Sequence, residues 1–222
     1  MLKTLIAALA LLTVPAAADE AARPLPPPAL DATGSAAATE TAVFAGGCFW
    51  GMQGVFQHVN GVKQVLSGYS GGSAFSAQYY TVGSGATGHA ESVQIVFDPR
   101  VVSFGKLLQV YFSVMDPTTL DYQGPDHGSQ YRSEIFAADD TQRRTAQAYI
   151  AQLSKAHVFS APIVTGVGAL HGFYPAESYH QDYLIRHPDE PYIVINDLPK
   201  IARLRGFYPQ LYRERPVTVA QR

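Results

Sequence analysis

The chain has 222 residues, 47% of them hydrophobic and 15% charged, which is typical of one medium-sized globular domain with appendages. A net charge of −2 excludes the basic surface that nucleic acids or anionic membranes require. One cysteine excludes an intramolecular disulfide, and the seven histidines have no short metal-ligand spacing, so we expect neither a metal centre nor a bound cofactor.

The first forty residues are predicted to lie outside the folded domain. Lys3 precedes an apolar run at residues 5–14, which is too short to cross a bilayer, and residues 16–18 offer a small-residue cleavage site. We interpret residues 1–18 as a signal peptide rather than a buried helix. We therefore expect an exported protein without a stable membrane anchor, periplasmic if the source is a Gram-negative bacterium. Residues 19–40 are rich in Pro and Ala and predict a disordered linker.

Strand and helix patterns then follow one another through a single domain, residues 41–213, with a flexible tail at 214–222. Alternating or β-branched runs predict strands, and apolar spacings of three and four residues predict helices. The predicted order is strand 41–45, helix 48–59, strand 62–69, Gly/Ser-rich loop 70–88, strand 90–97, helix 104–115, polar loop 118–130, strand 131–137, helix 139–155, strand 163–170, helix 176–186 and a short helix near 198–206. Two successive β-α-β units are the pattern of a ferredoxin-like two-layer α/β sandwich.

Cys48 stands between the first predicted strand and the first predicted helix. Gly46 and Gly47 permit a sharp turn before it, and Phe49 and Trp50 follow it. The free N–H groups of a helix start favour an anion, so we expect the thiol pKa to fall below its free value of roughly 8.5. The residue is then a nucleophile in an apolar pocket, and the alternative is a buried structural cysteine.

Glu91 shares the parity of Val93, Ile95 and Phe97 along its predicted strand. It should therefore point to the buried face, where a desolvated carboxyl has a raised pKa and can act as a general acid. The alternative is a carboxylate that turns to solvent at the end of the strand.

Four segments together carry a family resemblance. They are Gly-Gly-Cys-Phe-Trp-Gly at 46–51, Gly-Ala-Thr-Gly-His-Ala-Glu at 85–91, Asp-His-Gly-Ser-Gln-Tyr-Arg-Ser at 126–133 and Ala-Glu-Ser-Tyr-His-Gln at 176–181. In this order they resemble the signatures of the A class of peptide methionine sulfoxide reductases. The resemblance implies a ferredoxin-like fold with additions. It also implies reduction of the S epimer of methionine sulfoxide, free or within oxidised proteins, as repair of oxidative damage.

The same resemblance implies roles for single residues. Cys48 would attack the sulfoxide sulfur while the aligned Glu91 delivers a proton to the oxygen, leaving a sulfenic acid on the cysteine. Tyr79 and Tyr131 align with tyrosines that hydrogen-bond this oxygen. Tyr80 would replace Tyr79 after a slip of one residue, and either aligned tyrosine could instead be ordinary sheet packing.

Three further residues align with parts of the substrate site. Asp126 aligns with an aspartate that helps to orient the site, and its alternative is a turn residue. Phe49 and Trp50 would form the walls of a slot for the S-methyl group, although Phe49 could equally be a core residue. The residues after 187 contain no resolving cysteine, so recycling would need an external thiol, glutathione or a thioredoxin-like protein.

Two other functions compete with this one. An exported cysteine acyl-transfer enzyme or hydrolase would need a histidine base oriented by Asp or Asn, for which His89 is the closest candidate. An exported binding module with an aromatic cleft would leave the set of Cys, Glu and Tyr residues without a purpose. We expect a monomer with no nucleic-acid partner.

Overall fold

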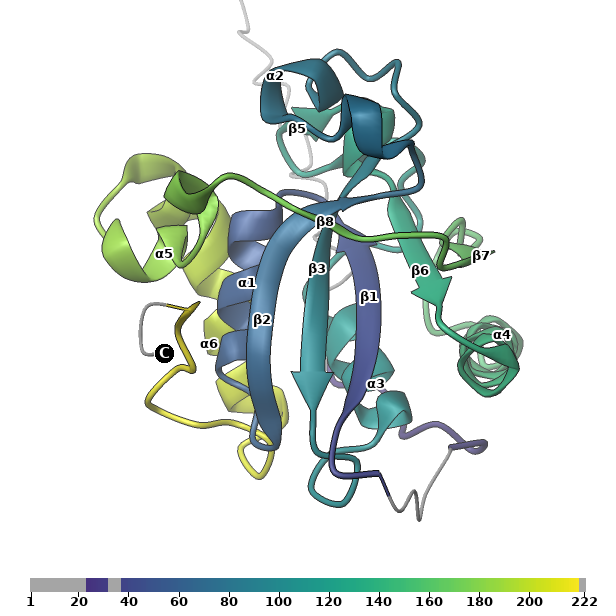
Figure 1. Ribbon diagram of the computed structural model, residues 1–222. Coiled ribbons are helices and arrows are strands. Elements are labelled where there is room, and N and C mark those ends of the chain that lie inside the picture. Colours follow the sequence, from purple (N-terminus) through teal and green to yellow (C-terminus); the bar gives the residue numbers. More distant parts are fainter. Residues whose placement is uncertain (1–22, 32–36, 220–222) are drawn as a thin grey trace, which may run out of the picture.

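The computed structural model describes residues 23–31 and 37–219. Its centre is a six-stranded sheet in the order β7-β6-β1-β3-β2-β8 (Figure 1). The strands are β1 (Glu40–Gly46), β2 (Val62–Ser70), β3 (Ala90–Phe97), β6 (Ser133–Ala137), β7 (Gly166–Ala169) and β8 (Tyr174–Pro175), with a separate hairpin of β4 (Tyr122–Gln123) and β5 (Asp126–His127). The four strands β6-β1-β3-β2 pair antiparallel in the order of a split βαβ sandwich, which confirms the predicted fold.

Helices cover one face of this sheet, as Figure 1 shows for α1, α3 and α6. The α-helices are α1 (Phe49–Gln57), α2 (Tyr79–Val82), α3 (Phe104–Val114), α4 (Asp140–Lys155), α5 (Tyr183–Arg186) and α6 (Leu198–Phe207). Shorter turns are η1 (Ala74–Ser76), η2 (Ser129–Tyr131), η3 (Ser178–His180) and the π-helical η4 (Ile193–Asp197). Apolar side chains of α1, α3 and β3 form the main core between these layers. Within the described residues, no helix is both long and apolar enough to span a membrane.

Four predicted elements differ from the structure. Tyr131 ends the turn η2 rather than opening a strand, and the two predicted loops contain α2 and the β4–β5 hairpin. The predicted helix 176–186 is broken at Asp182, which has a left-handed φ of 55°. The break is stabilised by α1, because Gln57 Nε2 donates to the Asp182 carboxylate at 2.6 Å and the Asp182 N–H donates to Gln53 Oε1 at 2.9 Å.

The prediction of a disordered linker at 19–40 is wrong for the part that the structure describes. Residues 23–31 pack against the helical layer, with Leu25 only 4% exposed. The Leu25 N–H donates to the Tyr208 hydroxyl at 2.8 Å, and Asp31 accepts from the Gly105 N–H at the start of α3. Contacts with distant residues, which composition does not reveal, therefore order this segment.

The two chain ends complete the comparison with the predicted domains. The tail predicted to be flexible from 214 onward packs onto α1 and its neighbours, since the Val217 N–H donates to the Gln57 carbonyl and the Val219 N–H donates to the Asp182 carboxylate. That prediction is therefore wrong as far as residue 219. The predicted signal peptide, residues 1–18, lies outside the described residues.

Candidate active site

Cys48 sits in the turn that joins β1 to α1 and directly precedes the helix. Gly47 has a φ of +86°, and a Cβ there would lie 2.6 Å from the Cβ of Gln123, so only glycine fits this turn. The Cys48 side chain is 8% exposed. The turn thus places a nearly enclosed thiol at the start of α1, as the sequence predicted.

Glu91 lies beside this thiol. It pairs with Tyr69 in the β2–β3 register, is 4% exposed and accepts a hydrogen bond from the Phe49 N–H at 3.0 Å. Its predicted burial is confirmed. Burial raises the pKa of Glu91 to about 8, with Asp126 and Asp197 adding to the rise and the Phe49 N–H opposing it. The carboxyl therefore holds its proton at neutral pH.

The thiol itself behaves differently from the sequence prediction. Burial, together with the carboxyls of Glu91 and Asp197, raises the pKa of Cys48 well above its ordinary value. Lys200 and a hydrogen bond from the Trp50 N–H act in the opposite direction but are smaller effects. The expectation of a lowered pKa is therefore wrong, because the site removes the thiol from water and surrounds it with acids.

Two tyrosines share the surroundings of Glu91. Tyr79 begins α2, and Tyr131 ends η2. Burial raises the pKa of both, to about 12 for Tyr79, and Glu91 is the next largest cause in each case. Tyr80, the alternative to Tyr79, is 89% exposed. The structure therefore brings Tyr79 and Tyr131 to the carboxyl and leaves Tyr80 at the surface.

Asp126 reaches the site through a residue that the sequence did not single out. The Tyr192 hydroxyl donates to Asp126 Oδ2. Burial and the nearby Cys48 raise the pKa of Tyr192, so its hydroxyl keeps its proton. Asp126 thus holds a neutral tyrosine beside the thiol.

Phe49 and Trp50 occupy different surroundings. Phe49 is 1% exposed and packs between Tyr69 and His180, with ring centroids 5.8 and 5.0 Å away. Trp50 stacks on Tyr183 at 3.8 Å, and its Nε1–H donates to His180 Nδ1 at 3.0 Å. Both rings are therefore fixed in place, and His180 joins them.

An ion pair beneath the first turn of α1 was not predicted. Lys200 Nζ donates to Asp197 Oδ1 at 3.0 Å, Asp197 is fully buried, and its Oδ2 has no hydrogen-bond partner. A Cβ on Gly51 would lie 2.1 Å from Asp197 Oδ1, so glycine is required there. The sequence signal was only an acid and a lysine three residues apart, a spacing that is common on surface helices.

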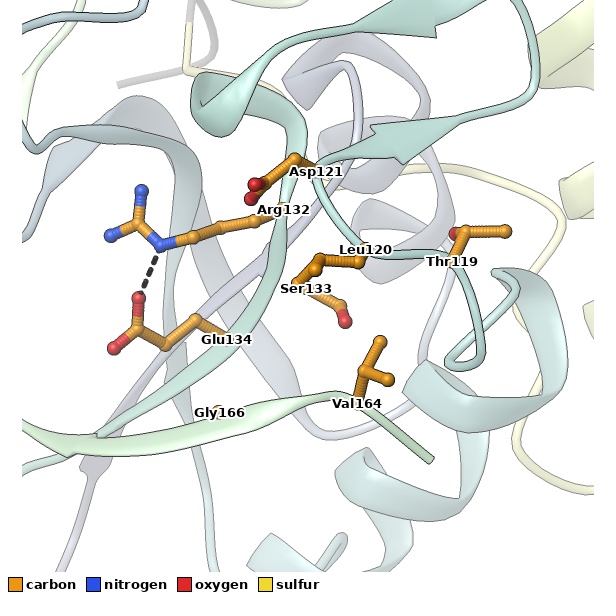
Figure 2. Close-up of a pocket in the computed structure, with 8 residues that line it drawn as sticks. All are labelled: Thr119, Leu120, Asp121, Arg132, Ser133, Glu134, Val164 and Gly166. Carbon is orange, nitrogen blue, oxygen red and sulfur yellow. Dashed lines mark hydrogen bonds and ion pairs between the residues drawn. The ribbon is translucent and has the colours of Figure 1, made fainter. Parts of the chain in front are cut away.

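Two cavities border the segment between α3 and β6. One, of about 230 Å³, is lined by Arg132, Glu134 and six other residues shown in Figure 2, none of them a predicted site residue. There Arg132 Nε donates to Glu134 Oε2 at 2.7 Å. A second, of about 400 Å³, lies between the β4–β5 hairpin and α6 and borders Asp126, Tyr192 and Lys200. The residues described include no His, Cys, Asp and Glu cluster that could hold a metal ion.

The comparison with protein families decides the identity of the chain. The model for the family described as "Peptide methionine sulfoxide reductase" matches residues 40–209. The chain belongs to this family. Peptide methionine sulfoxide reductases reduce oxidised methionine and so repair proteins, and this is the enzymatic activity of the chain.

Relatives and solved structures agree with this assignment. The chain is 60% identical over 186 residues to the peptide methionine sulfoxide reductase MsrA 2 of Mesorhizobium japonicum, a match that covers 83% of the chain and 95% of the relative. It is 50% identical over 188 residues to MsrA 2 of Synechocystis, covering 83% and 88%. Methionine sulfoxide reductase A of Corynebacterium diphtheriae has a similar structure, with a TM-score of 0.60, 32% identity and coverage of 70% and 77%.

The family assignment also disfavours the acyl-transfer alternative, and the structure gives a physical reason. His89 is 1% exposed, its Nδ1 accepts from the Gly72 N–H at 3.2 Å, and its Nε2 bonds the Ser73 carbonyl at 2.9 Å. Both ring nitrogens are thus occupied by loop backbone.

Proposed function

We propose that the protein reduces the S epimer of methionine sulfoxide, free or within polypeptides, through a sulfenic acid on Cys48. The observation that carries this proposal is the hydrogen bond from the Phe49 N–H to Glu91 Oε2 at 3.0 Å. It fixes a buried carboxyl, protonated at neutral pH, next to the cysteine. A nucleophile and a general acid on one side of a dry pocket suit attack at sulfur with proton transfer to oxygen.

Cys48 and Glu91 both hold a proton at neutral pH, and this suits a reduction step in which the enzyme and substrate together neither gain nor lose protons. Glu91 gives its proton to the sulfoxide oxygen while Cys48 Sγ bonds to the sulfoxide sulfur and its thiol proton passes to the Glu91 carboxylate. The hydroxyl group of this intermediate then moves from the substrate sulfur to Cys48 Sγ as the bond between the two sulfurs breaks, so that methionine leaves and Cys48 carries the oxygen as sulfenic acid. The cysteine sulfur is oxidised by two electrons and the sulfoxide sulfur is reduced by two.

The remaining site residues would shape and polarise this pocket. Tyr79 and Tyr131, whose hydroxyls stay protonated, would donate hydrogen bonds to the sulfoxide oxygen as its charge develops. Phe49 and Trp50 would pack against the S-methyl group, and the fixed stacking of Trp50 on Tyr183 would select one epimer. Asp126 would orient the site through Tyr192.

Recycling requires an electron donor from outside the chain. Cys48 is the only cysteine, so no intramolecular disulfide can form. We assign this role to a thiol, either glutathione or a thioredoxin-like protein, which would attack the sulfenic sulfur, release water and leave a mixed disulfide for a second thiol to resolve. The cavity of about 400 Å³ that borders Asp126 and Lys200 is large enough to admit a small thiol.

The place of this reaction is part of the proposal. The apolar run at residues 5–14 and the small residues at 16–18 support export, to the periplasm if the source is a Gram-negative bacterium. Secretion of a fusion of residues 1–40 to a reporter, lost when the apolar run is interrupted by a charge, is the expected result.

Turnover of a methionine sulfoxide peptide with dithiothreitol tests the function. The S epimer should be reduced and the R epimer should remain. Cys48→Ser should abolish turnover, because an alcohol is a poor nucleophile towards sulfur at neutral pH. Turnover of both epimers at equal rates, or activity of the serine variant above the reagent background, would contradict the proposal.

A further inference from the structure

Two exposed tyrosines flank the site and have no role in the chemistry above. Tyr80 on α2 is 89% exposed, and Tyr179 in η3 is 50% exposed. Large aromatic side chains that gather at the surface next to a site are a common mark of a contact surface.

A continuous series of ring contacts connects these tyrosines to the pocket. The Tyr80 ring lies 5.8 Å from Tyr79, the Tyr79 ring lies 4.4 Å from His180, and Tyr179 lies 4.2 Å from the same imidazole. His180 in turn contacts Phe49 at 5.0 Å. The exposed rings are therefore the outer end of a series of aromatic contacts that reaches Phe49, the residue after Cys48.

The backbone that carries the two tyrosines is held rigidly. Glu177 accepts the Tyr79 N–H at 3.0 Å and the Tyr69 hydroxyl at 2.9 Å, so one carboxylate joins α2, β2 and the turn before η3. Arg186 donates to the Tyr179 carbonyl at 2.7 Å. A surface that is already ordered loses little entropy on binding, which favours recognition by preorganised rings.

We propose that Tyr80 and Tyr179 form an aromatic lip that binds apolar side chains on either side of a methionine sulfoxide in an unfolded polypeptide. The inference rests on the proposed function, since the oxidised methionine enters the pocket while its neighbours lie on the lip. An extended chain is favoured over a folded partner, because a cysteine that is 8% exposed is reached by a side chain that projects deeply. Tyrosine suits this role, because its ring binds apolar groups and its hydroxyl can bond a peptide group.

Steady-state kinetics with dithiothreitol as the reductant tests the lip. Three substrates would be compared: N-acetyl-methionine sulfoxide N-methylamide, a capped pentapeptide with Phe on both sides of the sulfoxide, and the same peptide with Gly on both sides. Tyr80→Ala and Tyr179→Ala should each raise KM for the Phe peptide by about two- to tenfold, the value of an aromatic contact, with kcat unchanged. KM for the other two substrates should change less than twofold.

Matched variants separate binding from folding effects. Tyr80→Phe and Tyr179→Phe keep the aromatic rings, so they should retain most of the wild-type preference for the Phe peptide over the Gly peptide. Val101→Ala shortens a side chain that is 58% exposed and lies beyond the end of β3 that is opposite to Glu91, so it should change none of the three KM values. Equal losses on all three substrates, or no loss on the Phe peptide, would overturn the proposal. A loss that appears only when a thioredoxin-like protein replaces dithiothreitol as the reductant would also overturn it, and would assign the lip to reductant docking.

A binding measurement tests the lip independently of the proposed chemistry. Calorimetry with a Phe-flanked peptide that carries norleucine in place of the sulfoxide should give binding that weakens in Tyr80→Ala and Tyr179→Ala. If wild type fails to reduce the capped amino acid but binds this peptide through the lip, the proposed chemistry fails and the lip stands. If reduction succeeds and the lip variants bind the peptide as wild type does, the lip fails and the chemistry stands.

Discussion

The β1–β3 region and the region from η3 to α6 both form the site, but they contribute different things. The first supplies Cys48 and Glu91 from a tight turn and a regular strand, and the N–H of Phe49, the residue after Cys48, donates to the Glu91 carboxyl. The second supplies His180, Tyr192 and Asp197, from short turns that regular periodicity does not describe. The core of the fold thus positions the reacting groups, while an irregular segment fixes the shape and charge around them.

This comparison predicts that the largest effects on rate come from the β1–β3 region. Glu91→Gln keeps the hydrogen bond from the Phe49 N–H but removes the proton that the sulfoxide oxygen needs. We expect kcat/KM to fall by ~10²–10⁴-fold, the usual range for loss of a general acid. Steady-state assays between pH 6 and 9 would measure it. A variant whose rate and pH profile match wild type would show that another group supplies the proton.

The same variant tests the cost of burying the carboxyl. The pKa of Glu91 is about 8 in the folded protein, against an ordinary value of 4.5. Between these values the folded state keeps the proton that the unfolded state releases, so wild type loses stability as pH rises through this window. Glu91→Gln does not titrate, and its stability relative to wild type should rise from pH 5 to pH 8 and then level off. Urea unfolding at pH 5, 6.5, 8 and 9 measures this, and a constant difference would contradict the raised pKa.

The segment at residues 23–31 should contribute to stability rather than to chemistry. Leu25 is 4% exposed and its N–H donates to Tyr208, which follows α6. Leu25→Ala should lower the free energy of unfolding by about 2 kcal/mol, a typical cost for a buried leucine. Leu30→Ala, in the same segment but 51% exposed, should change it by less than about 0.5 kcal/mol. Equal effects in chemical denaturation would mean that the segment does not pack as described.

A smaller change, in the reactivity of the thiol, is expected when the ion pair between Asp197 and Lys200 is broken. Asp197 raises the pKa of Cys48, so Asp197→Asn should lower that pKa while Lys200 remains as a cation. Alkylation by iodoacetamide at pH 7.5 should then be a few-fold faster than in wild type. Asp140→Asn, which removes an exposed acid on α4, is the control and should leave the rate unchanged. Slower or unchanged alkylation of Asp197→Asn would indicate that the acid does not act on the thiol.

The contrast between the two regions also explains what could be predicted from sequence. Alternation along β3 indicated the burial of Glu91, and the Gly46-Gly47 turn indicated that Cys48 opens a helix, because both depend on neighbours in the chain. The raised pKa of Cys48 could not be predicted, since it depends on burial and on Asp197, which is distant in sequence. Local patterns were sufficient only where local contacts decide the structure.

The predictions for irregular segments were wrong for a related reason. The predicted helix 176–186 has an acceptable apolar spacing, but side chains of α1 capture Asp182 and break it. The Pro-rich residues 23–31 resemble a linker in composition, and contacts with residues far along the chain order them. In both cases long-range hydrogen bonds outweigh a weak local preference.

The central claim is that Cys48 alone carries the redox chemistry, and intact mass after a single turnover tests it most directly. One equivalent of methionine sulfoxide without reductant should release one methionine per chain and add one oxygen atom to the protein. Dimedone should then add one label, at Cys48, and none to Cys48→Ser. The enclosure of the thiol should keep disulfide-linked dimers a minor product. Methionine release without an added oxygen or a dimedone label, or rapid formation of a covalent dimer as the main product, would contradict the account.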